Sequence, residues 1–473
     1  MGQKIQKNIK FGTDGWRGVI SDNFTFENVA IVAQAISEWI KKDFELQEGK
    51  PNIVAVGYDA RFLSQEYAEI VSCVLVANNI KVYLSNNMIP TPALSYGVVD
   101  VKGVAGVMIT ASHNPGKFNG IKIKTYQGGG ASNDITDKVE AYLEKVEVQT
   151  INLKQAKKEQ KIIMYDFNDA YLKFMKSYVD LTKIKESKFK VIQDIMHGSG
   201  GGILEDVLKG SQIDLEYMRN SINPSFGGVK PEPVEEYLED ILKRMKTEDF
   251  DLGLVLDGDA DRISAIAPGG EFINPQKILG LLILHLVRNR GFKGGIIKTI
   301  CGTELIDNIA NKLNLKLYET PVGFKYISDL MVSEEIIAGG EEAGGMGVQG
   351  YIPERDGNLS GLLLLEMMVY QKKNMKQILE EMEAEFGRYY YERAGLELGD
   401  SKFDPKRTAA VKTLLGEKVI EVKDFDGVKL ICEDRSWLML RPSGTEPLVR
   451  AYSEAKSLQK AKELIECGKK LLK

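Results

Sequence analysis

The sequence predicts three similar α/β units with mixed sheets, followed by a smaller α+β domain at the C-terminus. Up to residue 376, short apolar runs rich in β-formers alternate with segments of helical length, as in βαβ units. Three of these runs end in a polar, glycine-rich loop that leads on toward a helix, which suggests a weak internal repeat. After residue 376, apolar runs follow one another closely and one helix closes the chain. At 473 residues the chain is too long for a single core.

The first unit is expected over residues 1–160. Strands are predicted over 52–57, 80–84, 106–109 and 120–124, and helices over 26–41 and 65–77. Residues 11–18 form a glycine-rich loop around Arg17, and an arginine there can fork onto a phosphate. The polar stretch from Tyr58 to Arg61 is interpreted either as a support for site residues or as an ordinary strand end. Residues 148–161, rich in Lys and Gln, are expected to be a linker.

The strand at 106–109 ends in Thr110-Ala111-Ser112-His113-Asn114-Pro115. A serine at the tip of a buried strand holds its hydroxyl on a rigid base, at the sheet edge where ligands collect in open α/β folds. The same polar residues also suit a plain turn or helix cap. Both interpretations stay open on this stretch alone.

The second unit is expected over 161–262, with strands at 190–195 and 251–256. The second strand ends in Asp257-Gly258-Asp259-Ala260-Asp261-Arg262. Three carboxylates at alternate positions repel one another unless a cation lies among them, and oxygen ligands favour Mg²⁺ or Ca²⁺. An EF-hand loop would need Gly in place of Arg262 and Glu in place of Pro268. A solvated acidic turn is the alternative.

The third unit is expected over 263–376. Helices are predicted over 275–287, 304–313 and 359–370, and strands over 295–300 and 336–338. His285 lies on an apolar helical stretch and is expected in the core. A loop at 320–326 leads into a helix, and Glu341 and Glu342 follow the second strand between glycines. Paired glutamates there suit a hydroxyl-rich ligand, or form a flexible acidic turn.

The last domain is expected over 377–473, with strands at 419–422, 428–432, 437–440 and 449–453 and a helix at 458–472. Between two strands lies Arg441-Pro442-Ser443-Gly444-Thr445. Backbone N–H groups, two hydroxyls and an arginine in one tight loop make a phosphate nest, and Arg450 lies on the next strand.

Composition narrows the classes of partner and location that are expected for this protein. The net charge is −5 and no basic run occurs, which argues against nucleic acid as a partner. The longest apolar helical stretch, 278–287, is too short to span a bilayer, so no membrane association is expected. Four scattered cysteines and a polar N-terminus predict a cytoplasmic protein with reduced thiols. A monomer or a homodimer is expected.

The Ser112, aspartate and Arg441 motifs, together with residues 11–18, resemble the phosphoglucomutase/phosphomannomutase family over nearly the whole chain. The resemblance implies four domains around a central cleft, with small-molecule sugar phosphates as substrates. It implies a phosphoserine at Ser112 and Mg²⁺ held by this group and the carboxylates of Asp257, Asp259 and Asp261. It also implies a hexose 1,6-bisphosphate as intermediate and activator.

The resemblance also assigns the other site residues. The catalytic candidates are Ser112, Arg17, Lys122, His113 and Lys325. The substrate-binding candidates are Arg262, Gly323, Phe324, Glu341, Ala343, Arg441, Ser443, Gly444, Thr445 and Arg450. Lys122 would exchange a proton with the sugar oxygen if burial and neighbouring cations lower its pKa.

Two positions depart from the family pattern. Ala343 stands where a serine is usual, and Lys325 stands where many bacterial relatives carry histidine, as in glucose-preferring members. The expected activity is therefore transfer of a phosphate between O1 and O6 of glucose, and also of mannose. A phosphoglucosamine mutase and a non-catalytic phosphosugar-binding protein are the alternatives. A serine hydrolase is disfavoured, because Gly-x-Ser-x-Gly is absent and neighbouring side chains such as Ser112 and His113 point apart in a regular element.

Overall fold

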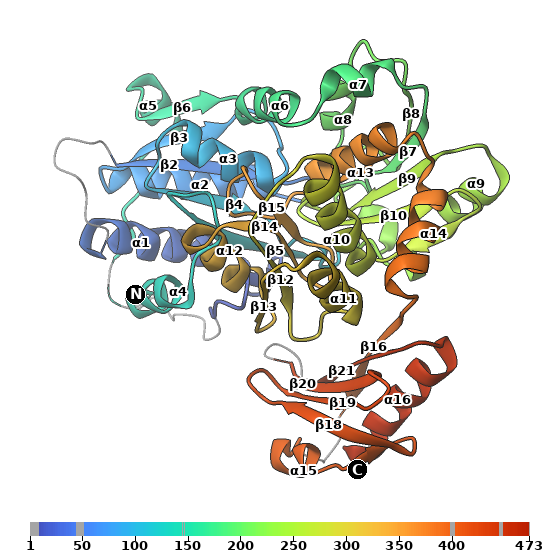
Figure 1. The fold of residues 1–473 in the computed structure, drawn as a ribbon. Helices are drawn as coiled ribbons and strands as arrows, with labels where there is room; N and C mark the ends of the chain where they lie inside the picture. Colours follow the sequence, from blue (N-terminus) through green and yellow to red (C-terminus); the bar gives the residue numbers. More distant parts are fainter. Residues whose placement is uncertain are drawn as a thin grey trace.

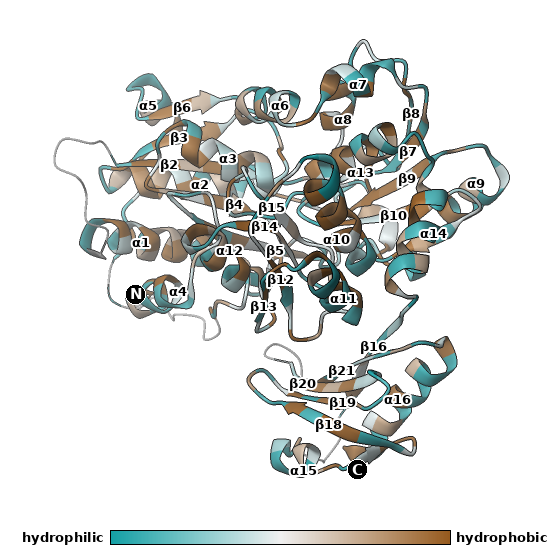
Figure 2. Cartoon of the chain, viewed as in Figure 1, coloured by the Kyte–Doolittle hydropathy of each residue, from teal (hydrophilic) through white to brown (hydrophobic). Residues whose placement is uncertain are grey.

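The computed structural model describes residues 9–43, 52–143, 145, 147–397, 403–443 and 448–472. Three α/β units lie together in one body, and the fourth unit hangs below them, joined through β16 (Tyr390–Glu397) (Figure 1). Hydrophobic strands run through the interior of each unit, while the helices carry both a hydrophobic and a hydrophilic side (Figure 2). The architecture confirms the predicted fold class.

The first sheet has the order β1-β5-β4-β2-β3-β6. Its strands are β1 (Trp16–Val19), β2 (Ile53–Tyr58), β3 (Lys81–Ser85), β4 (Ala105–Ile109), β5 (Phe118–Thr125) and β6 (Ile162–Tyr165). The helices are α1 (Phe26–Asp43), α2 (Ser64–Ala77), α3 (Thr91–Asp100), α4 (Asn133–Tyr142) and α5 (Leu153–Lys158). Alternate residues of β2 and β4 face two separate cores, so that α1 and α2 cover one face of the sheet and α3 the other.

Two expectations for this unit are wrong. Residues 148–161 are not a plain linker, because they contain α5 and lead into β6, which pairs with β3 in the first sheet. The buried side chains of Ala156 and Ile162 anchor this segment to the core. Residues 11–18 are not wholly a loop either, since β1 begins at Trp16 and pairs antiparallel with β5.

The second sheet has the order β11-β10-β9-β7-β8. Its strands are β7 (Lys190–Asp194), β8 (Asp214–Met218), β9 (Leu252–Leu256), β10 (Ile263–Ala267) and β11 (Glu271–Ile273). The helices are α6 (Phe167–Tyr178), α7 (Leu181–Glu186), α8 (Ile203–Leu208) and α9 (Glu239–Thr247), with short 3₁₀ turns at Phe226–Gly228 and Glu235–Tyr237. Since β6 belongs to the first sheet and β10 to the second, the boundaries expected at 160 and 262 each fall before a strand of the preceding unit.

The third sheet has the order β13-β12-β14-β15. Its strands are β12 (Gly295–Thr299), β13 (Leu317–Thr320), β14 (Ile336–Gly340) and β15 (Met346–Val348). The helices are α10 (Pro275–Leu284), which runs on into a π-helical turn (His285–Asn289), α11 (Glu304–Leu313), α12 (Phe324–Ser333), α13 (Gly357–Gln371) and α14 (Met375–Phe386). The expected boundary at 376 falls inside α14. His285 is a buried core residue, as predicted, with Nε2 2.6 Å from Oε2 of Glu366.

The fourth sheet is antiparallel, in the order β16-β21-β20-β19-β18-β17. Its further strands are β17 (Thr413–Leu414), β18 (Glu417–Lys423), β19 (Val428–Cys432), β20 (Trp437–Pro442) and β21 (Leu448–Ala455). The helix α16 (Leu458–Leu471) packs on one face, and α15 (Pro405–Ala409) lies near β19.

The three α/β units share one feature that positions the site. In each, a parallel strand is followed by an antiparallel neighbour, and the connection between the two carries the polar motif. The Ser112 loop joins β4 to β5, the aspartate loop joins β9 to β10, and the Glu341 loop joins β14 to β15. The internal repeat expected from the sequence is thus a repeat of loop position.

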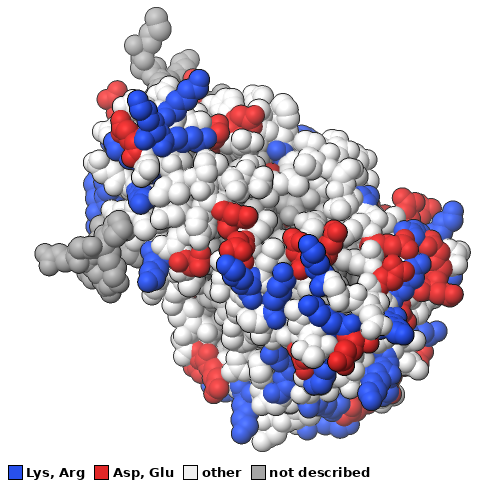
Figure 3. All heavy atoms as spheres, turned by 90° about the horizontal axis from the view of Figure 1, so that it is seen from above, with Lys and Arg blue, Asp and Glu red and all other residues white. Residues whose placement is uncertain are grey.

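Two further observations concern the surface and the helices. On the face shown in Figure 3, acidic and basic side chains are interspersed and no extended surface of one sign is visible. Among the helices of the described residues, none has the length and apolar character needed to cross a membrane.

Candidate active site

A cleft of about 900 Å³ lies where the four units meet. Each unit contributes to its wall. Charged residues of the wall include Asp14, Arg17, Lys230, Glu232, Arg262, Lys325, Glu341, Arg355, Arg393 and Arg450. The wall is rich in cations, as an anion-binding cleft in an acidic protein requires.

Ser112 lies fully buried behind the cleft wall, which the following residues His113 and Asn114 line, and its φ is +52°. Its Oγ donates a hydrogen bond to Oδ2 of Asp257 at 3.0 Å, and its backbone N–H donates to Oγ1 of Thr110 at 2.9 Å. The Thr110 hydroxyl in turn donates to Asp59 at 2.6 Å. Left-handed backbone at a serine costs about 1–2 kcal/mol, so these bonds hold a strained turn in place.

The expectation that Ser112 and His113 point apart is wrong. Their Oγ and Nδ1 atoms lie 3.4 Å apart, because the turn at Ser112 is not a regular element. His113 nevertheless lacks the setting of a hydrolase base. Burial first, and then the charges of Arg262, Arg17 and Lys122, hold its pKa well below the usual range.

The three aspartates come together as a candidate metal site. One carboxylate oxygen from each of Asp257, Asp259 and Asp261 lies within 4.8 Å of the others, and all three residues are buried. The Oδ1 atoms of Asp259 and Asp261 have no hydrogen-bond partner among the described residues. Burial first, and then the two neighbouring carboxylates, raise the pKa of Asp257 well above its usual value. Buried, unpaired carboxylate oxygens fit a hard divalent cation.

Gly258 explains how this loop reaches Ser112. A Cβ atom at this position would lie 2.5 Å from the carbonyl oxygen of Ser112, so only glycine lets the two loops approach this closely. The glycine in the Asp-Gly-Asp-Ala-Asp motif therefore serves the contact between the first and second units.

Lys122 lies buried on β5 and joins the two units by charge. Its Nζ lies 2.8 Å from Asp259, 2.7 Å from Asp261 and 2.9 Å from Asp14. Burial alone lowers the pKa of Lys122, but these three carboxylates outweigh burial and raise it above the ordinary value. Proton exchange by Lys122 was expected only if burial and neighbouring cations lower its pKa, and this condition is not met because three carboxylates surround its ammonium group.

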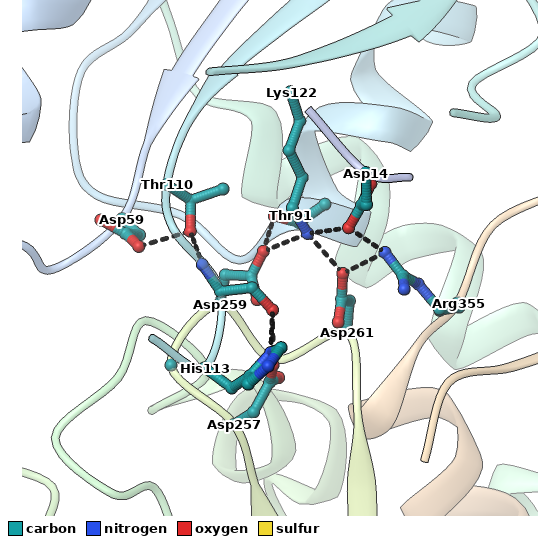
Figure 4. A network of polar contacts seen from close by, with 12 residues as sticks. Asp14, Asp59, Thr91, Thr110, His113, Lys122, Asp257, Asp259, Asp261 and Arg355 are labelled. Atoms are coloured by element: carbon teal, nitrogen blue, oxygen red, sulfur yellow. Dashed lines mark hydrogen bonds and ion pairs between the residues drawn. The ribbon is translucent and has the colours of Figure 1, made fainter. Parts of the chain in front are cut away.

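Two residues that the sequence analysis did not assign, Asp14 and Arg355, complete this network (Figure 4). The Nη2 atom of Arg355 lies 2.6 Å from Asp14 and 2.7 Å from Asp261, and its Nη1 atom lies 3.1 Å from Glu341. Arg355 thereby joins all three α/β units. Burial opposes ionisation of Asp14, but Arg355 and Lys122 hold its pKa well below the usual value.

Sequence offered little signal for Arg355. It lies in a short charged loop before α13, with no motif around it. The one position in the sequence that reflects Arg355 is Gly345, because a Cβ atom there would lie 2.0 Å from Cδ of Arg355. That glycine leaves room for the arginine side chain to cross beneath the Glu341 loop.

The candidate sugar residues line one side of the cleft. Gly323, Phe324, Lys325, Glu341 and Ala343 all belong to its wall, as does Glu342. Lys325 is 8 % exposed and its Nζ donates to Oδ1 of Asn133. Burial lowers the pKa of Lys325, and burial also raises the pKa of Glu341.

Two arginines among the site candidates belong to the cleft wall. Arg17 lines the cleft and donates from Nη1 to Oδ1 of Asn114 at 2.6 Å. Arg262 also lines the cleft, and its backbone pairs with Gly345, so that the aspartate and Glu341 loops meet.

The phosphate-nest candidates fall into three groups. Arg450 lines the cleft. Arg441 is not among the described residues of the wall, and its Nε donates to Oδ1 of Asp426 at 2.8 Å. Ser443 is described at the end of β20, while Gly444 and Thr445 lie outside the described residues.

Comparison with known proteins gives a consistent result over nearly the whole chain. Profiles of the phosphoglucomutase/phosphomannomutase α/β/α domains I, II and III match residues 8–150, 169–270 and 274–386, and the C-terminal domain profile matches 397–466. A phosphoglucomutase/phosphomannomutase of Thermococcus kodakarensis is 29 % identical over 98 % of both chains. A phosphoglucosamine/phosphogalactosamine mutase of Sulfurisphaera tokodaii is 28 % identical, also over 98 % of both.

Solved structures agree. A Thermus thermophilus protein described as a candidate phosphomannomutase superposes with a TM-score of 0.87 at 32 % identity, covering 98 % of this chain and 99 % of its own.

Proposed function

The chain belongs to the phosphoglucomutase/phosphomannomutase family of intramolecular phosphotransferases, and on that premise we propose that it moves a phosphate between O1 and O6 of glucose phosphate, and of mannose phosphate as well. One observation carries the proposal. The Ser112 hydroxyl lies 3.0 Å from Asp257, in a triad of buried carboxylates, and the residues next to both loops, His113, Asn114 and Arg262, line a cation-rich cleft. A phosphate on Ser112 would meet these groups directly.

In this proposal Ser112 carries the transferable phosphate. A hydroxyl oxygen of the sugar phosphate attacks phosphorus, the bond between phosphorus and Ser112 Oγ breaks, and Oγ takes up a proton. The product, hexose 1,6-bisphosphate, turns around in the cleft and returns its other phosphate to Ser112. Phosphoryl transfer of this kind depends on positioning and charge. Arg17, 2.6 Å from Asn114 of the same loop, is placed to face the phosphoryl group.

The aspartate triad would hold Mg²⁺, because Asp259 and Asp261 each have a buried carboxylate oxygen that accepts no hydrogen bond from the described residues. When bound, the metal ion would offset negative charge on the transferring phosphoryl group. Lys122, with its raised pKa, would remain protonated and add positive charge there. Lys325 is the better base for the sugar hydroxyl, since burial lowers its pKa.

Glu341 would accept hydrogen bonds from two sugar hydroxyls, with Phe324 and Lys325 flanking the ring. Glucose and mannose differ only at the 2-hydroxyl, so a site that holds the 3- and 4-hydroxyls accepts both. Phosphoglucosamine mutase is the second candidate. The observation in its favour is the carboxylate of Glu342, which also lines the cleft and would suit a 2-ammonium group.

We keep the cytoplasm as the proposed location, because the described cysteines are all free thiols.

A substrate panel tests the assignment. We expect the protein to interconvert the 1- and 6-phosphates of glucose and mannose, with glucose at least as fast. Exclusive turnover of glucosamine 6-phosphate would transfer the assignment to the second candidate. No turnover of any of these sugars would contradict the enzyme assignment.

Intact-protein mass spectrometry tests the phosphoserine. One labile phosphate is expected on the wild type, none on Ser112→Ala, and mutase activity should disappear with it. Ser72→Ala is the matched control, because Ser72 is a buried serine of the same unit whose hydroxyl donates to the Ala68 carbonyl, away from the cleft wall. Near-normal activity of Ser112→Ala would contradict the proposal.

A further inference from the structure

Arg61 holds the backbone of the Ser112 loop. Its side chain is fully buried, and its guanidinium donates to four carbonyl oxygens of that loop. Nη2 donates to Ser112 and Asn114, both at 2.6 Å, and Nη1 donates to Pro115 at 3.0 Å and Phe118 at 2.9 Å. Four carbonyls bound to one guanidinium fix the backbone path of the seven residues 112–118. An ordinary turn or strand end does not require so many contacts to one side chain.

Arg61 is also held by Asp59, the carboxylate that supports Ser112 through Thr110. Nε of Arg61 lies 3.2 Å from Oδ2 of Asp59, the atom to which Thr110 also donates. Thr110 in turn accepts the N–H of Ser112. Arg61 and Asp59 thus bracket the strained turn from its carbonyl side and its amide side.

The second unit presses on the other side of Arg61. The ring of Phe226 lies over the guanidinium, and its centroid is 4.7 Å from Cζ of Arg61. Phe226 is fully buried and has φ of +53°, a left-handed conformation that a bulky residue rarely adopts. Beside it, a Cβ atom on Gly116 would lie 2.7 Å from the carbonyl oxygen of Pro224 and 2.8 Å from Cα of Ser225. The 224–226 turn therefore packs directly on both the arginine and the loop that it holds.

From this arrangement we propose that Arg61 and Phe226 form a positioning pair for phosphoryl transfer, which keeps the Ser112 hydroxyl directed at the aspartate triad. The proposal rests on the proposed function of Ser112. Arg61 is a positioning residue and not a catalytic one, since its buried guanidinium donates to backbone carbonyls of the Ser112 loop and acts only through them. Because Phe226 belongs to the unit that carries the triad, the pair fixes the two halves of the reaction centre to each other.

Single-turnover transfer from glucose 1,6-bisphosphate to dephosphorylated enzyme tests the pair, followed by the mass of the Ser112 phosphate. Arg61→Lys keeps the charge but has one donor atom for four carbonyls, and we expect transfer to slow by about 100-fold. Phe226→Leu keeps an apolar cover without the ring, and we expect about a tenfold loss. The affinity for glucose 1-phosphate, measured by calorimetry on each variant combined with Ser112→Ala, should stay within about twofold of Ser112→Ala alone.

Phe250→Leu is the matched control. Phe250 is a buried ring of the same unit with Arg244 over its face at 5.1 Å, and it lies outside the described cleft wall. It should leave the transfer rate unchanged. A rate for Phe226→Leu equal to that of the control, or an equal fall in rate and affinity, would overturn the proposal.

Two further arms keep the outcomes distinct. Gly116→Ala forces the loop away from the 224–226 turn without touching Arg61, and we expect it to slow transfer in the same way. It replaces Arg61→Lys as the test if that variant fails to fold. The wild type separates the two proposals. Wild-type protein that accepts no phosphate contradicts the proposed function, and the pair with it. A normal wild type together with a Phe226→Leu rate equal to that of Phe250→Leu contradicts the pair alone.

Discussion

Replacing Arg355 by glutamine should destabilise the protein far more than the loss of one ordinary ion pair. The arginine is 3 % exposed and meets three carboxylates, at 2.6 Å (Asp14), 2.7 Å (Asp261) and 3.1 Å (Glu341). Without it, Asp14 and Asp261 keep Lys122 at 2.9 and 2.7 Å and one further arginine each at 3.9 Å, while the buried Glu341 loses its ion-pair partner. Leaving one buried charge unpaired costs about 3–5 kcal/mol. We expect the free energy of unfolding to fall by at least that amount.

Urea unfolding in buffer with EDTA provides the assay, so that metal binding does not enter. Arg288→Gln is the matched control, because Arg288 makes a bidentate pair with Glu385 at 2.7 and 2.8 Å but is 41 % exposed. Exposed pairs contribute about 0–1 kcal/mol. If Arg355→Gln loses no more stability than Arg288→Gln, the carboxylates do not depend on Arg355 and the network in Figure 4 is not a stabilising one.

Three further predictions concern chemistry and pH. Asp259→Asn should lower turnover by about two orders of magnitude, as loss of a main electrostatic stabiliser does; full activity of the wild type in excess EDTA would contradict an essential metal there. Ala343→Ser should change kcat/KM by no more than about tenfold, because one neutral hydrogen bond contributes only about 0.5–1.5 kcal/mol, and a larger change would give this position a stronger part in sugar choice. Burial raises the pKa of Asp356 to about 7 from 3.8, so the folded protein retains this proton to higher pH than the unfolded chain. Its contribution to stability should therefore fall as the pH rises from about 4 to 7, and Asp356→Asn should flatten that part of the urea-midpoint profile; an unchanged slope would assign the pH dependence to other groups.

The sequence predicted the elements and loops that depend on local pattern. Apolar runs with β-branched residues identified β2, β4, β9 and β12, and the motifs at their ends marked Ser112 and the aspartates. Short or half-exposed strands were missed. β8 and β16 mix polar and apolar residues, and β1 follows a glycine-rich loop, so their pairing partners decide their conformation rather than their own residues.

The charge network was beyond sequence reasoning for a different reason. The pKa of Lys122 depends on which charges surround it, and Asp14, Asp259 and Asp261 lie far from it along the chain. The sequence left open whether Arg61 supports the site or only ends a strand, because the carbonyls that it holds begin 51 residues later. Neither contact leaves a periodic signal. Only the repeated loop position, which brings three distant loops to one cleft, makes these residues neighbours.

The span of the Arg355 contacts also has a consequence for synthesis on the ribosome. Asp14 precedes Arg355 by 341 residues along the chain, and Lys122 precedes Asp259 by 137 residues. While the nascent first unit emerges, Asp14 and Lys122 can pair with each other but lack their partners from the second and third units, so the edge around β5 stays hydrated. We expect this unit to remain a hydrated, protease-accessible intermediate until the loop before α13 has left the exit tunnel, which makes completion of the third unit the committed step of folding.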